Sequence, residues 1–510
     1  RNSAFSDQVA KLQHQLGTTE TLLNNWMLAQ SKHSTLVALM QTAAARERCA
    51  EVAADFDAIN DAWDTMMAQA AMVLNVVETI ATDERSQQVL ALLARIENVE
   101  SQLQAYLHSH RTEVPCFFLL SNQALLNLMS LEGHPEKAIP YTRVLLPGVH
   151  DFGLEFRDNG ETQVLTSVQD RDGQRIEGLE IICNGPVEDW VSQLEVAIQE
   201  AVAAEVLEVV QAMVEDRQEA AANSVLQLII VALGIEHTAS IQMLLAPDKE
   251  KEGALSFEML NTKQQNELEE WLSQLCNSKT LASERSRLSA IIIDCMGWRD
   301  VMLALAAEKD FDRSASSFAW LSQIRYGVTA GSKQKESRCM VTIGNQQTAY
   351  GCSFIGHELS QTMRTTSIRA LQLSMSLAVQ MSAGVLVQGG AGCGKTQTLR
   401  GTAHAFGHLC GTIVGSEATT AQSLLDSLTG LAYGGVWTEI RNVSRLPINV
   451  LSLLCQAARS VLDACRMNRA RQARLQESDI CASINGVEVS VGTGFALLSI
   501  AKFGEAGTGT

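Results

Sequence analysis

Proline is scarce in this sequence of 510 residues: seven occur, none before Pro115 and none between Pro247 and Pro447. Proline breaks helices because it lacks an N–H donor and its ring clashes with the preceding turn, so these spans can form long helices. The twelve cysteines include no C-x-x-C pair. This spacing indicates neither a zinc site nor a disulfide framework, and it favours free thiols in a reducing cytosol.

An excess of positive charge is also missing, because 57 acidic residues outnumber 39 basic ones and leave a net charge of −18. This balance argues against a nucleic-acid-binding surface and, more weakly, against binding to an acidic membrane. The longest apolar run, residues 225–235, is interrupted by Gln227 and is far too short to span a bilayer. We therefore expect neither nucleic acid nor membrane as a partner.

The chain begins without an initiator methionine, at Arg1-Asn2-Ser3, and without a signal-peptide pattern. We expect it to be an internal part of a longer sequence or a partial gene model. Hydrophobic residues make up 46% and charged residues 19%, which is typical of a globular rather than a disordered protein. A chain of this length is expected to form about two to four domains.

One stretch matches the pattern G-x-x-x-x-G-K-[ST] at every fixed position. Its residues are Gly389, Gly390, Ala391, Gly392, Cys393, Gly394, Lys395 and Thr396. An apolar run at 385–387 predicts a buried parallel strand before it, and residues 398–409 predict a helix after it. Strand, glycine loop and helix together are the context of a phosphate-binding loop, whereas a chance match in a glycine-rich turn would lack these flanks.

The loop predicts a nucleotide site that holds ATP or ADP with Mg²⁺. Glycines let backbone N–H groups turn toward phosphate oxygens, and the following helix adds its positive N-terminal end. Lys395 is expected to contact the β- and γ-phosphates, and the Thr396 hydroxyl is expected to bind Mg²⁺.

Residues 1–110 predict three or four amphipathic helices whose apolar faces pack together. Between 148 and 184, glycine, aspartate and asparagine separate short strand-like runs, which predicts a small β-hairpin element. Helices are expected again from 187 to 233 and from 262 to 307. The expected core positions of the first helices are Leu12, Leu16, Leu22, Leu23, Trp26, Leu36, Phe56, Ile59, Trp63, Met67, Val89, Leu90, Leu92, Leu93 and Ile96.

Several short motifs occur in a characteristic order along the chain. They are Trp26, Asn60-Asp61-Ala62-Trp63, Pro115-Cys116-Phe117-Phe118-Leu119-Leu120-Ser121, Glu188-Asp189-Trp190, Trp298-Arg299-Asp300 and Phe318-Ala319-Trp320-Leu321-Ser322-Gln323-Ile324-Arg325. In this order they resemble the linker of the dynein heavy chain family, although His33 stands where an aromatic residue is common. The segment 350–356 resembles the start of that family's first AAA+ module, and the glycine loop falls where its phosphate loop belongs. The resemblance covers nearly the whole chain.

This resemblance implies an α-rich, elongated helical linker over residues 1–330, followed over 331–510 by part of the large α/β subdomain of an AAA+ module with a parallel sheet. It implies dynein intermediate and light chains or ciliary assembly factors as partners, with microtubules contacted only through regions outside this sequence. The implied location is the cytoplasm and cytoskeleton, including the axoneme of a cilium or flagellum.

The same resemblance exposes a departure on the strand that should carry the catalytic acids. The family has an Asp that helps to hold Mg²⁺ and a Glu that polarises the attacking water. With Trp437 and Arg445 in register, these positions fall on Arg441 and Asn442. An arginine is permanently cationic and cannot bind Mg²⁺, and an asparagine cannot act as a general base. A shifted register would bring in only Glu439, which strand alternation places on the same face as Arg441 but too deep to reach the phosphates.

Two further positions depart from the family pattern. The sensor asparagine falls on Lys502, after the apolar strand expected at 495–500 and before a matching Ala506-Gly507. A lysine cannot orient water as an amide does. Residues 359–364 replace the proline-containing segment that usually holds adenine, so base specificity is also affected.

Three hypotheses follow. The first is a dynein-like chain that binds nucleotide without hydrolysing it, as in a divergent, non-motile or regulatory member with a role in microtubule-based or ciliary assembly. The second is an active minus-end-directed microtubule motor whose catalysis is rescued by other residues. The third is a helical scaffold with a vestigial nucleotide site. The intact loop beside the missing acid pair favours the first.

Overall fold

The computed structural model describes residues 5–40, 46, 49–72, 83–131, 134–157, 162–245, 256–277, 282–307, 317–329, 338–359, 363–472, 481–484, 486–492 and 494–502. Contacts between Cα atoms divide the chain into two compact units, Arg1–Glu132 and Gly133–Thr510. The boundary expected between residues 330 and 331 lies outside the described residues, within the second of these units.

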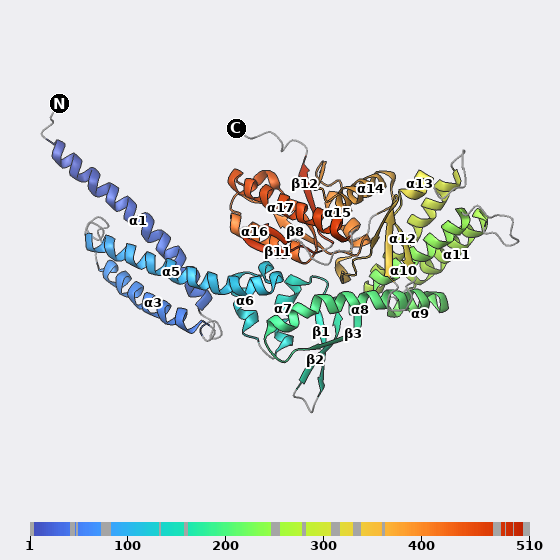
Figure 1. Cartoon of the computed structure of the whole chain (residues 1–510), viewed down its shortest axis with the longest axis horizontal. Coiled ribbons are helices and arrows are strands. Elements are labelled where there is room, and N and C mark those ends of the chain that lie inside the picture. Colours follow the sequence, from blue (N-terminus) through green and yellow to red (C-terminus); the bar gives the residue numbers. More distant parts are fainter. Residues whose placement is uncertain are drawn as a thin grey trace. The chain divides into compact units, whose positions relative to one another are not determined.

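The first unit is helical, as the periodicity predicts (Figure 1). Helix α5 contacts both of the other long helices. A short 3₁₀ turn, η1, begins at Pro115, where the proline lacks the N–H that a continuing helix would need. The elements are α1 (Ser6–Met40), α3 (Ala50–Ala71), α5 (Asp83–Glu113), η1 (Pro115–Leu119) and α6 (Asn122–Met129).

The core of the first unit contains the aromatic residues that the motifs indicated. The His33 ring stacks on Trp63, with 4.8 Å between ring centroids, and its Nε2 lies 3.2 Å from Asn60 Oδ1. The packing expectation is wrong near the start of α1, where the Leu12 and Leu16 side chains are 57% and 59% exposed. No described element covers that turn of the helix within its own unit. Three further expected core residues are also exposed: Leu23, Met67 and Leu90.

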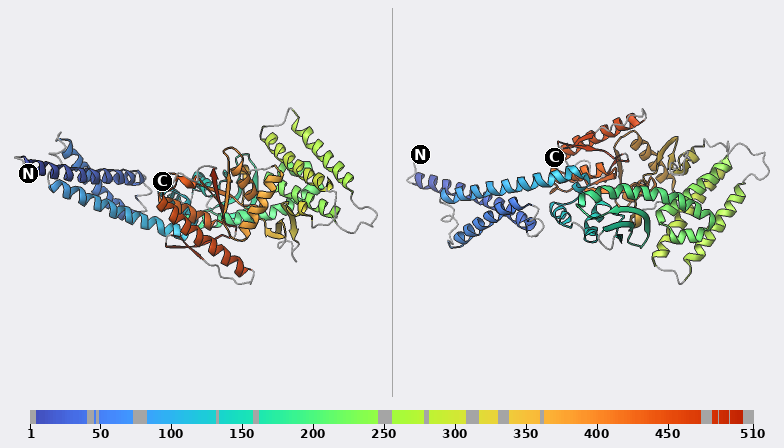
Figure 2. Two further views of the ribbon diagram at one scale, coloured as in Figure 1. Left: turned by 90° about the horizontal axis from the view of Figure 1, so that it is seen from above. Right: turned by 60° about the horizontal axis from the view of Figure 1, so that its bottom comes forward.

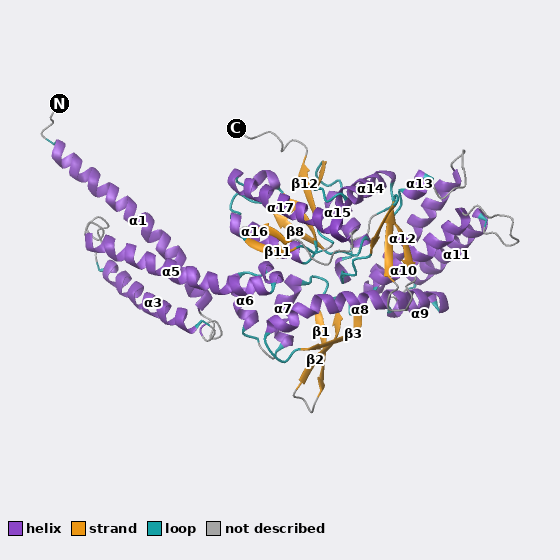
Figure 3. Ribbon diagram, viewed as in Figure 1, coloured by secondary structure: helices purple, strands orange, loops and turns teal. Residues whose placement is uncertain are grey.

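The second unit opens with helices and a small antiparallel sheet in the strand order β1-β2-β3 (Figure 3). Strands are therefore present where they were predicted, but there are three of them rather than the two of a hairpin. Helix α8 packs on β3, and α11 and α12 lie side by side (Figure 2). The elements are α7 (Pro135–Leu145), β1 (Asp151–Arg157), β2 (Thr162–Gln169), β3 (Arg175–Ile182), α8 (Val187–Glu215), α9 (Arg217–Asn223), α10 (Leu226–Leu245), α11 (Phe257–Leu275), α12 (Ala282–Ala307) and α13 (Phe318–Leu321).

A second antiparallel sheet, β4 (Arg325–Thr329), β5 (Arg338–Ile343) and β6 (Gln346–Ala349), was not predicted from the sequence. The sequence nevertheless contains features that are typical of such a hairpin. Residues 339–343 alternate in burial, and the two-residue turn Gly344-Asn345 joins β5 to β6, with Gly344 at φ +60°. Glycine adopts this left-handed conformation without steric cost, so the pair is a typical hairpin turn.

The remaining chain forms the predicted parallel α/β module. Its sheet has the order β7-β12-β9-β8, and all three strand pairings are parallel. The helix expected at 398–409 instead begins at Lys395 and ends at Ala405, because the chain enters the helix directly from the glycine loop. The strand before the loop is only half buried, since it has one described neighbour and Leu386 is 59% exposed. The elements are η4 (Gly356–Glu358), α14 (Thr366–Gln380), β7 (Val385–Gly389), α15 (Lys395–Ala405), β8 (Cys410–Val414), α16 (Ala421–Tyr433), β9 (Trp437–Arg441), η5 (Val443–Arg445), α17 (Ile448–Gln472), β10 (Cys481–Ile484), β11 (Val487–Ser490) and β12 (Ala496–Lys502).

Two described helices are long and apolar enough to cross a membrane by length and composition alone, Leu226–Leu245 and Ile448–Arg471. The first is 61% buried and packs on α8, α12 and β4. The second is 33% buried and packs on α16 and β10. Both contact patterns are those of helices within a folded domain. The expectation that no membrane is bound stays a prediction.

Candidate nucleotide site

The glycine loop joins the carboxyl end of β7 to the first residue of α15. Gly392 and Gly394 have φ angles of +74° and +77°, a left-handed region that glycine enters without the cost of a Cβ. Residues 390–394 are exposed, so the backbone N–H groups of the loop and of the first turn of α15 can be reached by an anion. A helix N-terminus below a glycine loop is an arrangement that binds phosphate.

Lys395 and Thr396 are the first two residues of α15 and are half buried. The Lys395 ammonium lies inside the curve of the loop: its Nζ donates to the carbonyl oxygens of Gly389, at 2.9 Å, and Gly390. Cys393 Sγ is 3.6 Å from the same nitrogen. The loop therefore holds the ammonium among its own backbone groups, where β- and γ-phosphate oxygens are expected.

Arg441 ends β9, and Asn442 follows it at the same edge of the sheet as the loop. The register shows this: Arg441 lies opposite Ile500 of β12, and Ile500 lies opposite Val387 of β7. Asn442 has φ +53° and ψ +39°, a left-handed conformation that asparagine tolerates better than most residues. The two residues assigned to the lost acid pair thus stand at the carboxyl end of a central strand, where ligands bind in open α/β sheets.

Glu439 has a side chain that is 0% exposed and lies on the same face of β9 as Arg441. Its Oε2 accepts hydrogen bonds from Arg441 Nη2 at 2.7 Å and from Thr412 Oγ1 at 3.2 Å. Arg400 Nε of helix α15 lies 3.8 Å from the same oxygen. The hydrogen bond to Glu439 raises the pKa of Arg441 further above its ordinary value. The carboxylate that a shifted register would have recruited is thus engaged by two guanidinium groups and a hydroxyl.

The sequence reasoning missed Arg400 and Thr412. Arg400 lies on α15, five residues after Lys395, and donates from Nη2 to Thr412 Oγ1 at 3.1 Å. No local pattern marks either residue, because their contact with Glu439 joins three segments that are separate in the sequence. We refer to Arg400, Thr412, Glu439 and Arg441 as the β9 ionic cluster.

Mg²⁺ does not fit this edge of the sheet as an ion held by the protein. Mg²⁺ prefers carboxylate and water oxygens in octahedral geometry, and Arg441 stands where the family pattern predicts its carboxylate. In the part of the chain that the structure describes, no group of three or more His, Cys, Asp or Glu side chains could hold a metal ion. The Thr396 hydroxyl is the one expected protein ligand that is present.

Two further departures from the family pattern, at Lys502 and at residues 359–364, lie only partly within the described residues. The backbone of Lys502 lies opposite Gly389, beside the start of the loop, but its side chain and residues 506–507 are not among those described. Residues 360–362 of the expected adenine segment also lie outside them. Arg364, at the end of that segment, bonds to Asp294 Oδ1 at 3.1 Å and lies 4.0 Å over the Trp298 ring. This arginine is held by α12.

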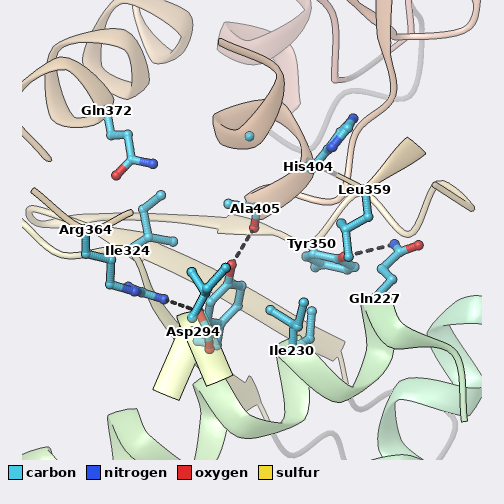
Figure 4. A pocket seen from close by; sticks show the side chains of 14 residues that line it. Gln227, Ile230, Asp294, Ile324, Tyr350, Leu359, Arg364, Gln372, His404 and Ala405 are labelled. Atoms are coloured by element: carbon cyan, nitrogen blue, oxygen red, sulfur yellow. Dashed lines mark hydrogen bonds and ion pairs between the residues drawn. The ribbon is translucent and has the colours of Figure 1, made fainter. Parts of the chain in front are cut away.

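Neutral hydrogen bonds join the far end of α15 to β4 and the segment 350–355 to α10 (Figure 4). Tyr326 Oη of β4 donates to the carbonyl of Ala405 at 2.9 Å. Gln227 of α10 donates from Nε2 to Tyr350 Oη and to the Ser353 carbonyl, both at 2.9 Å, and accepts from the Ile355 N–H at 3.0 Å. The cavity beside these groups has a volume of about 70 Å³, enough for a few water molecules rather than a nucleotide.

Comparison with known families agrees with this arrangement. Residues 1–209 match the family described as "Dynein heavy chain, N-terminal region 2". Residues 350–492 match the family described as "Hydrolytic ATP binding site of dynein motor region". The second match includes the glycine loop and all four residues of the β9 ionic cluster.

Similar curated proteins carry the same family name. The chain is 25% identical to "Dynein beta chain, flagellar outer arm" of Chlamydomonas reinhardtii over 92% of its own length. It is 25% identical to "Dynein axonemal heavy chain 11" of Sus scrofa and 24% identical to "Dynein beta chain, ciliary" of Heliocidaris crassispina, each over 96% of its length. The matched regions are only 10%, 11% and 11% of those proteins, so the chain spans about a tenth of the length of these relatives.

Proposed function

Because the chain belongs to the dynein heavy chain family and carries its ATP-binding region, we propose that it binds ATP or ADP and hydrolyses ATP slowly or not at all. The loop Gly389–Thr396 supplies the phosphate site, with the ammonium of Lys395 already among the loop carbonyls. The observation that carries the proposal is the pair Arg441 and Asn442 at the end of β9, in place of an Asp and a Glu.

The chemistry of the pair explains the loss of turnover. Water needs a general base to attack the γ-phosphate, and a missing general base lowers the rate about 10²–10⁴-fold. Neither the Asn442 amide nor the Arg441 guanidinium accepts a proton at neutral pH. Glu439 is fully buried in the β9 ionic cluster and is held there by Arg441, Thr412 and Arg400. Of the protein ligands expected for Mg²⁺, only the Thr396 hydroxyl is present among the described residues.

For the whole protein, we propose a heavy chain of an axonemal dynein, in the cytoskeleton of a cilium or flagellum. The printed names of the relatives support this setting: "flagellar outer arm", "axonemal" and "ciliary". In this setting the partners are dynein intermediate and light chains or ciliary assembly factors, and microtubules are contacted through parts outside this chain. The first ATP-binding module then has a structural or regulatory role.

A second candidate is an active minus-end-directed motor. The observation that favours it is the family match itself, since the matched region is described as hydrolytic. The third hypothesis, a helical scaffold with a vestigial loop, predicts no nucleotide binding at all.

Equilibrium titration of the 510-residue chain with a fluorescent ATP analogue tests the binding. Lys395→Ala should weaken binding at least tenfold, because a charge-assisted hydrogen bond contributes about 1.5–3 kcal/mol. The matched control is Lys137→Ala on the exposed face of α7. Equal affinity of the wild type and of Lys395→Ala would contradict the assigned role.

Hydrolysis is tested in the full-length parent protein, with its other candidate ATP sites inactivated. Microtubule-stimulated turnover of several ATP per second that is lost on Lys395→Ala would support the motor hypothesis and overturn the proposal. Turnover that rises only when Arg441→Asp is combined with Asn442→Glu would support the assignment of the lost acid pair.

A further inference from the structure

We propose that the phosphate loop binds its nucleotide independently of a divalent metal ion, with the guanidinium groups of Arg441 and Arg400 supplying the positive charge that Mg²⁺ supplies in related sites. The inference rests on the proposed nucleotide binding and adds to it how the charge of the phosphates is balanced. It starts from the misfit of Mg²⁺ at the edge of the sheet where β7 and β9 end.

The net charge of the site is opposite in sign to the net charge expected from the family pattern. Lys395 with an Asp and a Glu would carry one net negative charge, so a polyphosphate would need a divalent cation to bind there. In this chain the same three positions carry Lys395, Arg441 and the neutral Asn442, which leaves two net positive charges. Arg400 and Glu439 form an ion pair and do not change this total. Such a site attracts a bare polyphosphate, and an added Mg²⁺ would meet like charge.

The helix and the sheet determine how far these cations are offset from the phosphate loop. Arg400 lies about 7.5 Å along the axis of α15 from Lys395, given a rise of about 1.5 Å per residue. Arg441 is two strands from the loop strand β7, a lateral distance of about 10 Å at about 4.8 Å per strand. Its side chain is 32% exposed at the carboxyl end of β9, so it reaches solvent at the edge where the loop lies.

Glu439 positions the arginines without exhausting their donors. Both guanidinium groups approach its Oε2, by a hydrogen bond from Arg441 and an ion pair with Arg400. Among the described residues, the Nε atoms of both arginines are buried and therefore closed to an incoming anion. Nη1 of Arg441 and Nη1 of Arg400 take no part in the contacts with Glu439 and Thr412, and the two side chains are 32% and 33% exposed. A guanidinium has five N–H donors in a planar fork that matches two phosphate oxygens, so each arginine keeps donors for an anion.

Calorimetric titration of the 510-residue chain with ATP, once in Mg²⁺ and once in excess EDTA, tests the proposal. The expected dissociation constants agree within about threefold. Arg441→Gln should weaken binding in EDTA about tenfold to a hundredfold, as expected for the loss of a charge-assisted contact. Arg441→Asp should make binding depend on Mg²⁺. Arg459→Gln, which removes the same charge from an 85% exposed side chain of α17, is the matched control and should bind like the wild type.

The outcomes separate this inference from the proposal on which it rests. Wild-type binding that is tight in Mg²⁺ and more than tenfold weaker in EDTA would overturn the inference and leave nucleotide binding standing. Absence of binding under both conditions, in protein with a cooperative thermal transition, would overturn both. The comparison within the wild type decides the question even if the Arg441 variants fail to fold.

Discussion

The phosphate loop and the end of β9 lie at the same edge of one parallel sheet, yet their chemistry differs. The loop is exposed and built from backbone groups and glycines, and its one charged side chain bonds to the loop's own carbonyls. The end of β9 is built from side chains, with a fully buried carboxylate engaged by two arginines. In the proposed function, binding and hydrolysis depend on separate segments, so one can be lost while the other persists.

The largest effect is expected from breaking the β9 ionic cluster. Glu439→Ala leaves Arg400 and Arg441 facing each other without their shared carboxylate. Removing one partner of a buried ion pair costs about 3–5 kcal/mol, and we expect about 3 kcal/mol because both arginines are one-third exposed. Urea unfolding measures the loss, with Glu417→Ala on the exposed loop after β8 as the control. A loss below about 1 kcal/mol would show that the cluster does not stabilise the sheet.

The buried amide of Gln227, which joins α10 to the segment 350–355, tests how much neutral hydrogen bonds stabilise the fold beside the ionic cluster. Gln227→Leu removes three hydrogen bonds and leaves the Ile355 N–H and the Ser353 carbonyl to find other partners. Leaving buried polar groups unsatisfied costs about 1–3 kcal/mol, and we expect about 2 kcal/mol. Chemical denaturation checks this value against Gln265→Leu on the exposed face of α11, which should be close to neutral. Equal stability of the two variants would contradict the anchoring role.

A third site extends the comparison to Glu195, a half-buried carboxylate that forms no ion pair within the described residues. Burial raises the pKa of Glu195 to about 7, from 4.5. The proton is therefore held more tightly in the folded state, and this stabilisation is present below pH 4.5 and disappears as the pH rises through about 7. Glu195→Gln should raise the free energy of unfolding by about 1 kcal/mol at pH 8 and by much less at pH 5. A pH-independent difference between variant and wild type would refute the shift.

The smallest effect is expected from Cys393, a loop side chain that is not assigned to phosphate binding. Cys393 Sγ donates to the Gly390 carbonyl at 3.1 Å and is exposed, so Cys393→Ala should change the ATP dissociation constant less than about threefold. Gly394→Ala provides the contrast, because its φ of +77° makes a Cβ costly by about 1 kcal/mol. If the cysteine variant bound more weakly than the glycine variant, the backbone account of the loop would be wrong.

The parts of the molecule that the sequence predicted are those defined by short spacing. The strand, the glycine loop and the helix are contiguous, and the motif order that indicated the family is confirmed by the two family matches. Contacts between distant segments were not predictable. Arg400 and Thr412 both contact Glu439, but no sequence pattern near either residue indicates this partner. The prediction that Leu12 and Leu16 are buried was wrong for a related reason. Periodicity identifies an apolar face of a helix but not which element covers that face.

Under the proposed loss of the catalytic acid, the left-handed backbone at Asn442 makes that loss difficult to reverse in a single step. Asparagine accepts φ +53° readily, whereas a glutamate there would bear a cost of about 1 kcal/mol before contributing any chemistry. The reversal of Arg441 to aspartate would in turn place a second carboxylate beside buried Glu439 and remove its closest cation. Each reversion alone is therefore expected to destabilise the protein without restoring turnover. Restoring hydrolysis by one substitution at a time would therefore pass through less stable single variants. Random mutagenesis is expected to yield the double variant only rarely.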